Sequence, residues 1–316
     1  MDLLLNSFLF VVAVLFLYKG SDILVESAVK IAASLGISEL VIGLTVVAFG
    51  TSAPEMAVSI ESALAGKGDI SVGNVIGSNI FNLGLILGGM ALFITSKIDG
   101  PTYKRDAPLL LIVAAMIFLL AFGFHIPFVP VEGELTRWNG ALLLFTLIGY
   151  LMFLYFSSKK TKEEHHESKS IALKDLSLFV LGLVVIVIGG KFLLDSSVTI
   201  ARHFGLSEWF IGVTIVAVGT SAPELATSIM AAIKKKSDIS LGNLIGSDLF
   251  NLLGVLGLAA LISGKVSISP ESSIGISMML VSMAILFILI ITRKKIDRLS
   301  GSILILVSLF RWYVNL

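Results

Sequence analysis

The chain has no cysteine among its 316 residues, which excludes disulfides, thiolate metal sites and cysteine nucleophiles. Charged side chains are also scarce. Asp, Glu, Lys and Arg make up 14% of the positions, against roughly a quarter in soluble domains. Apolar residues make up 56%, and the mean hydropathy is +0.99. We therefore predict a protein that has lipid as its solvent, in which the placement of Lys and Arg matters more than the net charge of +1.

Long uncharged stretches recur along the chain, and most approach the roughly 20 residues that span a bilayer core. The first stretch has neither a basic segment before it nor a small-residue cleavage site, so we expect a retained helix rather than a signal peptide. The pattern predicts an all-α integral membrane protein with ten transmembrane helices, five in each half. They are expected near residues 3–32, 40–65, 71–95, 107–127, 138–157, 174–201, 209–233, 239–263, 271–292 and 299–314.

One sequence unit occurs twice. Residues 36–83 align with residues 205–252 at a constant offset of 169 without a gap, and thirty of the forty-eight positions are identical. Because five helices per half is an odd number, the second copy enters the membrane from the opposite side, and the repeats are inverted, as in several secondary transporters. The predicted parts are a first five-helix repeat (1–157, motif 43–84), a cytoplasmic linker (158–173) and a second five-helix repeat (174–316, motif 212–253).

Positive charges are distributed as inverted repeats require. The loop after the second helix holds Lys67 alone, while the equivalent loop of the second repeat holds three lysines at 234–236. Loops rich in Lys and Arg stay in the cytoplasm, so we expect a multi-pass protein of the cell membrane with its N-terminus outside. The linker contains His165 and His166, but adjacent histidines without a third spaced ligand are weak evidence for a metal site.

Each repeat contains the sequence Gly-Thr-Ser-Ala-Pro-Glu, which ends at Glu55 and at Glu224. An ionised carboxylate inside the membrane costs several kcal/mol unless it is compensated. The preceding proline removes a backbone donor and frees the carbonyl four residues back. Carboxylate, carbonyl and hydroxyl oxygens are the ligands that hard cations such as Na⁺ and Ca²⁺ prefer. We therefore predict broken second and seventh helices and a cation site at the two glutamates, with hydroxyl oxygens from Thr51, Ser52, Thr220 and Ser221.

A second motif follows in both repeats. Ser78 and Asn82 lie four residues apart on one face of a helix, as do Ser247 and Asn251. These polar side chains can therefore reach the same centre as the glutamates. Gly-x-x-x-Gly spacing predicts a close approach of each helix to a neighbour, at Gly73, Gly77, Gly242 and Gly246.

Structural interpretations compete with this site. A single intramembrane glutamate can be protonated and hydrogen-bonded, although two at equivalent positions of inverted repeats favour an ion site. Asp22, Glu26 and Asp195 fall on the first helix of each half, where helix-end or interface charges are the preferred interpretation. Asp248 replaces Asn79 of the first repeat. It is either a third acidic ligand or a neighbour that faces another helix.

The duplicated motifs resemble the repeats of the Ca²⁺:cation antiporter superfamily, and the whole chain resembles its prokaryotic Na⁺/Ca²⁺ exchangers. The resemblance implies that Glu55 and Glu224 bind Ca²⁺ and Na⁺ alternately, and that the hydroxyl and amide side chains above complete four clustered sites. It adds the backbone carbonyls of Ala48 and Ala217 as ligands. Several members, including K⁺-dependent exchangers, have Asp at the position of Asn251, so the asparagine here argues against K⁺ dependence.

The resemblance implies a secondary-active antiporter that exchanges Na⁺ for Ca²⁺ by alternating access. Two carboxylates give a charge of −2, which three Na⁺ overcompensate and one Ca²⁺ neutralises, so the exchange is expected to be electrogenic. A Ca²⁺/H⁺ antiporter and a cation channel remain alternatives. We expect no enzyme activity because no catalytic constellation is found in the sequence. We also expect no cofactor, no nucleic-acid partner and a monomer in the lipid bilayer.

Overall fold

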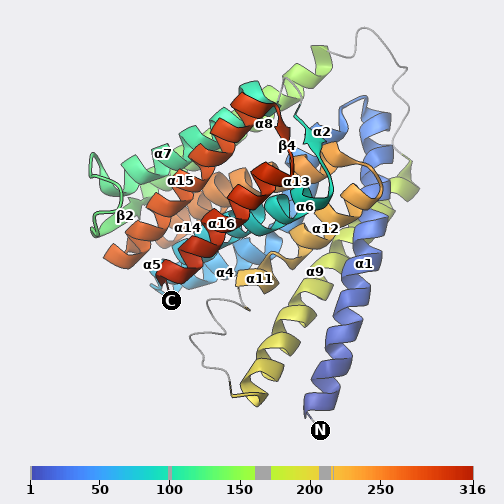
Figure 1. Ribbon diagram of the computed structural model, residues 1–316, viewed down its shortest axis with the longest axis horizontal. Helices are drawn as coiled ribbons and strands as arrows, with labels where there is room; N and C mark the ends of the chain where they lie inside the picture. Colours follow the sequence, from blue (N-terminus) through green and yellow to red (C-terminus); the bar gives the residue numbers. More distant parts are fainter. Residues whose placement is uncertain (1, 99–101, 161–171, 206–214, 216, 316) are drawn as a thin grey trace. The chain divides into compact units, whose positions relative to one another are not determined.

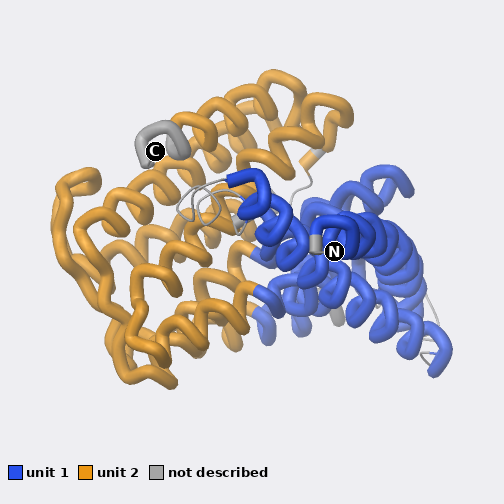
Figure 2. The backbone as a smooth tube through the Cα atoms, turned by 90° about the horizontal axis from the view of Figure 1, so that it is seen from below, with its two compact units in different colours: residues 1–54, 151–247 blue, residues 55–150, 248–316 orange. Residues whose placement is uncertain are grey.

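A computed structural model describes residues 2–98, 102–160, 172–205, 215 and 217–315. The chain forms two compact units, and both units take segments from both sequence repeats (Figure 2). Unit 1 contains residues 1–54 and 151–247, and unit 2 contains residues 55–150 and 248–316. Two of the three boundaries between the units fall inside the repeated motifs, after Pro54 and after Ser247, and the third follows Tyr150. The division of the sequence into two repeats and a linker stays a prediction, and residues 161–171 of that linker lie outside the described part.

Unit 1 is built on two long helices, α1 (Asp2–Leu35) and α9 (Leu173–His203), which run side by side in Figure 1. Glycines allow this contact. A Cβ on Gly182 would lie 2.8 Å from the backbone nitrogen of Leu24, and one on Gly189 would lie 2.9 Å from the Cβ of Phe16. The remaining unit 1 elements are short: α2 (Glu39–Ile42), η1 (Gly43–Val47), α3 (Ala48–Thr51), α11 (Ala217–Thr220), α12 (Ala222–Ile233) and most of α13 (Ser237–Leu249).

Unit 2 contains most of α4 (Ala53–Leu64) and the first part of α8 (Arg137–Lys160). Its other helices include α15, which is capped at its start because the Ser269 side chain accepts from the backbone nitrogen of Ser272. The helices are α5 (Gly68–Phe81), α6 (Gly88–Phe93), α7 (Ala107–Phe122), α14 (Leu256–Ser263), α15 (Pro270–Arg293) and α16 (Arg298–Asn315), with π-helical segments η2 (Asn82–Leu87), η3 (Thr102–Asp106) and η6 (Phe250–Val255).

Four short strands in unit 2 were not predicted. β1 (Ser96–Lys97) pairs antiparallel with β4 (Lys295–Ile296), and β2 (Gly133–Thr136) pairs antiparallel with β3 (Lys265–Ile268). Strands of two to four residues are too short to show an alternating pattern in the sequence. The predicted helix at 107–127 was also too long, because α7 ends at Phe122 and Gly123 has φ 66°.

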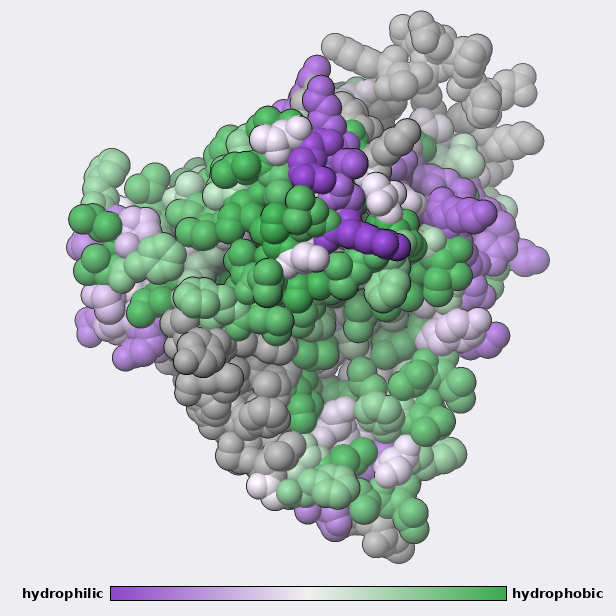
Figure 3. Space-filling view, viewed as in Figure 1, coloured by the Kyte–Doolittle hydropathy of each residue, from purple (hydrophilic) through white to green (hydrophobic). Residues whose placement is uncertain are grey.

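The described residues form an all-helical membrane protein apart from these strands. Seven of their helices are long and apolar enough to span a bilayer, and the bent pair Glu39–Thr51 and Ala53–Leu64 would make eight. Two shorter apolar helices, Ala222–Ile233 and Arg298–Phe310, are also present. Hydrophobic residues cover most of the surface that is coloured by hydropathy in Figure 3. Such a surface suits contact with lipid, because soluble monomers rarely expose large apolar patches.

Candidate cation-binding residues

The helix that leads to each glutamate is interrupted at a serine. Ser52 leaves helical geometry at φ −79° and ψ 7°, and Ser221 does so at φ −87° and ψ 11°. In the first repeat, the two helical pieces meet at an angle of 49°. Proline suits the start of the following helix, where its missing N–H is not needed. The predicted break in the second helix is therefore confirmed. Residues 209–214 and 216 of the predicted seventh helix lie outside the described part.

Both glutamates are fully buried and lie in the first turn of the helix that follows the break. Glu55 is in α4 and Glu224 is in α12. The first turn carries unpaired backbone N–H groups and the positive end of the helix dipole. This position lowers the cost of burying a carboxylate, so the break and the glutamate belong to one local arrangement.

In unit 1, Glu224 belongs to a buried polar group that joins both repeats. The Ser52 hydroxyl donates to Glu224 Oε1 over 3.1 Å. The Thr51 hydroxyl donates to Asn243 Oδ1 over 3.1 Å and lies 3.3 Å from the Ser247 hydroxyl. We call these five residues the Glu224 cluster. Three predicted site residues in addition to the glutamate, from segments almost 200 positions apart, therefore meet within one unit.

In unit 2, Glu55 accepts a hydrogen bond from the predicted partner Ser78, with 3.2 Å between Oγ and Oε1. The same unit holds a second set of buried side chains from both repeats. Asn82 Nδ2 donates to Asp248 Oδ1 over 3.0 Å, and Asn251 Nδ2 donates to Asn79 Oδ1 over 3.0 Å. We call Asn79, Asn82, Asp248 and Asn251 the amide cluster. The Asp248 carboxylate thus contacts a predicted ligand.

Two asparagines that were not predicted as site residues hold the glutamate helices in place. Asn74 Nδ2 donates to Ser59 Oγ over 2.9 Å and to the Glu55 carbonyl over 3.2 Å. The equivalent Asn243 Nδ2 donates to Ser228 Oγ over 3.1 Å and to the Glu224 carbonyl over 3.4 Å. Both asparagines and both serines are identical between the repeats, and this identity was the signal that could have found them.

Four predicted ligands belong neither to the two clusters nor to the pair of Glu55 and Ser78 as defined above: Ala48, Ala217, Thr220 and Ser221. Thr220 and Ser221 are buried at the positions equivalent to Thr51 and Ser52. The Ala48 carbonyl accepts from the Thr51 hydroxyl over 3.3 Å and from the Ser52 backbone nitrogen over 3.0 Å. Ala217 is the first residue of α11. Their role as ligands stays a prediction.

Close helix packing is visible at one of the two glycine pairs. A Cβ on Gly242 would lie 2.6 Å from the Leu40 carbonyl oxygen, and one on Gly246 would lie 2.7 Å from the Ala48 Cβ. These contacts bring α13, with Asn243 and Ser247, against residues 40–48. In the first repeat, a Cβ added to Gly73 or to Gly77 would meet no atom within 4 Å among the described residues. The segment that the repeat makes equivalent to 40–44 is residues 209–213, which lie outside them.

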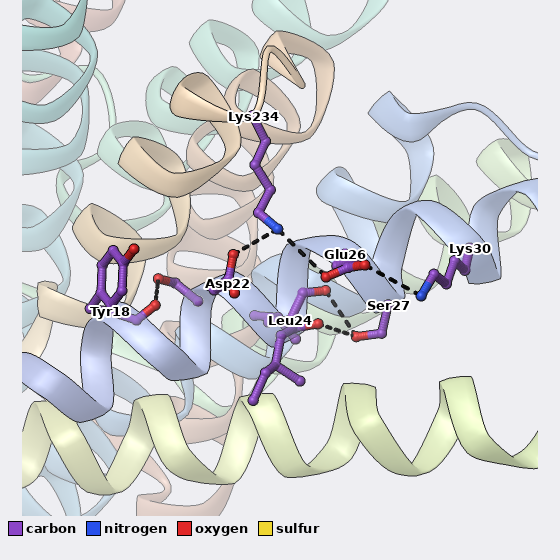
Figure 4. Close-up of polar contacts among 9 residues, drawn as sticks. Tyr18, Asp22, Leu24, Glu26, Ser27, Lys30 and Lys234 are labelled. Carbon is purple, nitrogen blue, oxygen red and sulfur yellow. Dashed lines mark hydrogen bonds and ion pairs between the residues drawn. The ribbon is translucent and has the colours of Figure 1, made fainter.

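Asp22 and Glu26 form ion pairs on α1, as the interpretation of interface charges predicted. Lys234, at the end of α12, lies 2.6 Å from Asp22 Oδ1 and 3.7 Å from Glu26 Oε2, and Glu26 also reaches Lys30 (Figure 4). Burial alone would lower the pKa of Lys234. The hydrogen bond and charge of Asp22, together with Glu26, outweigh burial and raise this pKa above its usual value of 10.5. Asp195 is exposed.

The two clusters offer oxygen ligands of the kind that hard cations bind. Glu224 Oε2, Asn82 Oδ1 and Asn251 Oδ1 are buried and have no hydrogen-bond partner in the described part of the chain. Buried polar atoms are normally paired, so unpaired acceptors suit a cation. Among the described residues, no three His, Cys, Asp or Glu side chains gather in one group. The available ligands are therefore neutral oxygens beside single carboxylates.

Comparison with known proteins agrees with these features. The sodium/calcium exchanger protein family matches residues 5–156 and 174–314. The putative antiporter CaxA of Alkalimonas amylolytica is 35% identical, and the match covers 93% of both chains. The sodium/calcium exchanger MaX1 of Methanosarcina acetivorans is 34% identical over 95% of both chains. A solved structure of the sodium-calcium exchanger NCX_Mj, soaked with Na⁺ and Sr²⁺, is 30% identical and superposes with a TM-score of 0.83 over 98% of both chains.

Proposed function

Because the chain belongs to the sodium/calcium exchanger family, we propose that it exchanges Na⁺ for Ca²⁺ across the membrane. It is a multi-pass membrane protein of the antiporter type, and its family consists of transporters rather than enzymes. The observation that carries the proposal is the pair of fully buried glutamates at equivalent positions of the two repeats. An intramembrane carboxylate is a functional feature by default, since burying it without a role is costly.

The proposed ion ligands are the twelve residues that the sequence predicts. Support comes from the hydrogen bonds that join Thr51 to Ser247, Ser52 to Glu224 and Glu55 to Ser78. Unpaired acceptor oxygens in both clusters add to this support. The set consists of Ala48, Thr51, Ser52, Glu55, Ser78, Asn82, Ala217, Thr220, Ser221, Glu224, Ser247 and Asn251.

The proposed architecture has ten transmembrane helices in two inverted repeats, with the N-terminus outside and the linker in the cytoplasm. The distribution of lysines supports this orientation. Alternating access would move the predicted first and sixth helices against a core of the predicted second, third, seventh and eighth helices. The protein would work as a monomer without a cofactor and without K⁺, the last because Asn251 replaces the aspartate of K⁺-dependent relatives.

Transport driven by a Na⁺ gradient tests the function. We expect purified protein in proteoliposomes to take up ⁴⁵Ca²⁺ when Na⁺ is high inside and low outside, with pH clamped on both sides. An inside-negative potential should speed Na⁺ entry coupled to Ca²⁺ extrusion, since an exchange of three Na⁺ for one Ca²⁺ moves one charge, worth about 2.3 kcal/mol per 100 mV. Uptake that followed a pH gradient and ignored Na⁺ would indicate a Ca²⁺/H⁺ antiporter. Persistent single-channel currents would indicate a channel.

The ion pairs of Lys234 provide a test of the proposed movement of α1. The raised pKa keeps Lys234 charged at and above the usual lysine value, so on the alkaline side the pairs are lost only as the pH rises through the folded-state pKa. Partly exposed pairs of this kind contribute about 1 kcal/mol or less. If α1 leaves α12 during transport, Lys234→Gln should raise turnover by up to about fivefold and leave the KM for Ca²⁺ unchanged.

Lys235→Gln is the matched control for this variant. Lys235 is the next residue and is exposed, so its substitution removes the same formal charge without removing the Lys234 contacts. We expect its turnover, measured as initial ⁴⁵Ca²⁺ uptake per protein, to equal that of the unmodified chain. Equal effects of both substitutions would show that surface charge matters and that the ion pairs do not.

A further inference from the structure

Two residues of the amide cluster have no role among the twelve proposed ligands. Asn79 and Asp248 occupy equivalent positions in the two repeats, yet one is an amide and the other an acid. Both are fully buried in unit 2. They lie three residues before Asn82 and Asn251 respectively, and therefore on the same helix face as these asparagines. Hydrogen bonds that cross between the repeats join these side chains in two pairs, and the Asn79 side chain links the pairs through the backbone carbonyl of Asp248.

The first connection determines the orientation of Asn251. Asn79 Nδ2 lies 3.3 Å from the backbone carbonyl oxygen of Asp248. A carbonyl oxygen only accepts, so the side of the Asn79 amide that faces it must be the NH₂ group. The Asn79 Oδ1 then points toward Asn251. Because this oxygen only accepts, Asn251 must donate with its NH₂ group, and Asn251 Nδ2 lies 3.0 Å from Asn79 Oδ1. This leaves Oδ1 of Asn251 without a hydrogen-bond partner in the described part of the chain.

The hydrogen bond between Asn82 and Asp248 determines the orientation of the Asn82 amide. Its Nδ2 lies 3.0 Å from Asp248 Oδ1. An ionised carboxylate has acceptors and no donor, so it selects the NH₂ side of the amide. An asparagine at position 248 would lack this selectivity, because it offers a donor and an acceptor. Asn82 Oδ1 is accordingly buried without a hydrogen-bond partner among the described residues.

We propose that Asn79 and Asp248 are positioning residues that hold the side-chain carbonyl oxygens of Asn82 and Asn251 ready for the transported cation. This inference rests on the proposed function only in the identity of the ion. Hard cations bind the oxygen of an amide and are repelled by its NH₂ group. An amide free to rotate would spend part of its time with the wrong end toward the ion. The repeats differ at positions 79 and 248. In this proposal, the amide of Asn79 orients Asn251 and the acid of Asp248 orients Asn82.

Equilibrium binding of ⁴⁵Ca²⁺ to the purified full-length protein tests the proposal with a double-mutant cycle. We expect Asp248→Ala to weaken Ca²⁺ binding about tenfold, the size of a coupling between residues in contact. In the Asn82→Ala background, where no amide is left to orient, the same substitution should have an effect of less than about twofold. The parallel cycle of Asn79→Ala with Asn251→Ala should behave in the same way.

Three further comparisons make the outcome decisive. Asp248→Asn keeps an acceptor oxygen but adds a donor, so it should recover only part of the affinity that Asp248→Ala loses. Ser277→Ala removes a buried hydroxyl elsewhere in unit 2, which donates to the Ser273 carbonyl, and should bind Ca²⁺ normally. Equal losses for Asp248→Ala with and without Asn82 would overturn the proposal and make Asp248 a direct ligand. Ca²⁺ binding measured in Na⁺-free buffer needs no counter-ion, so failed Na⁺ exchange by the unmodified protein would refute the proposed function alone.

Discussion

Glu224→Gln is expected to abolish Na⁺-driven Ca²⁺ uptake, with about a thousandfold loss in kcat/KM. The substitution is nearly isosteric, and the new side-chain oxygen can still accept from Ser52 as Glu224 Oε1 does over 3.1 Å. The loss therefore reports the removed charge. One unit charge acting on another at about 4 Å is worth about 4 kcal/mol at an effective dielectric constant of 20, which corresponds to about three orders of magnitude in affinity. Initial ⁴⁵Ca²⁺ uptake into proteoliposomes over a range of Ca²⁺ concentrations measures this loss.

Two further variants test whether the loss is specific to buried glutamates. Glu55→Gln should cause a loss of the same order, because Glu55 occupies the equivalent buried position and accepts from Ser78. Glu134→Gln should transport like the unmodified protein, since Glu134 is half-exposed on β2 and lies 3.9 Å from Lys265. If either buried glutamate could be replaced with more than about a tenth of the activity retained, a carboxylate would not be an essential ligand there.

The sequence predicted the site better where the chemistry was local. The break at Ser52 could be anticipated because proline acts on its own helix, and the glutamates because charge in an uncharged stretch needs compensation. Asp248 could not be assigned. Its contact with Asn82 joins residues 166 positions apart, and helical spacing alone does not decide which neighbour a side chain faces. Nevertheless, the three-residue spacing of Asn79 and Asn82 placed both on one face, and this signal was overlooked.

The fold shows the same limit. Hydropathy identified the long helices α1, α9 and α15, because spanning a bilayer requires long apolar runs. It did not identify the paired strands β2 and β3, which follow from contacts between distant loops. The π-helical segments were also unforeseen. η2 begins at Asn82 and η6 contains Asn251, so the wide turns fall on predicted ligands in both repeats. Such turns are frequent at functional sites, but their hydrogen bonding has no simple sequence pattern.

Gly246→Ala is expected to lower the melting temperature and to reduce Ca²⁺ uptake at least tenfold, although it adds one methyl group. The new Cβ would lie 2.7 Å from both the Leu44 carbonyl oxygen and the Ala48 Cβ. Because two of its nearest neighbours are backbone atoms of Leu44, they cannot move aside as a flexible side chain would. Overpacking of this kind costs about 1–3 kcal/mol. The strain would also push Ser247, the next residue, away from its 3.3 Å contact with Thr51.

Gly149→Ala is the matched control. This glycine is exposed on α8, and a Cβ there would meet no atom within 4 Å among the described residues. Alanine is favoured over glycine in a helix by about 1 kcal/mol, so the control should melt at or slightly above the temperature of the unmodified protein and transport normally. Thermal unfolding of both variants in detergent, followed by uptake assays, separates the two substitutions. If Gly246→Ala melted and transported like the control, α13 would not approach residues 40–48 as closely as the structure shows. Close packing at Gly246 would then not be what brings Ser247 to Thr51.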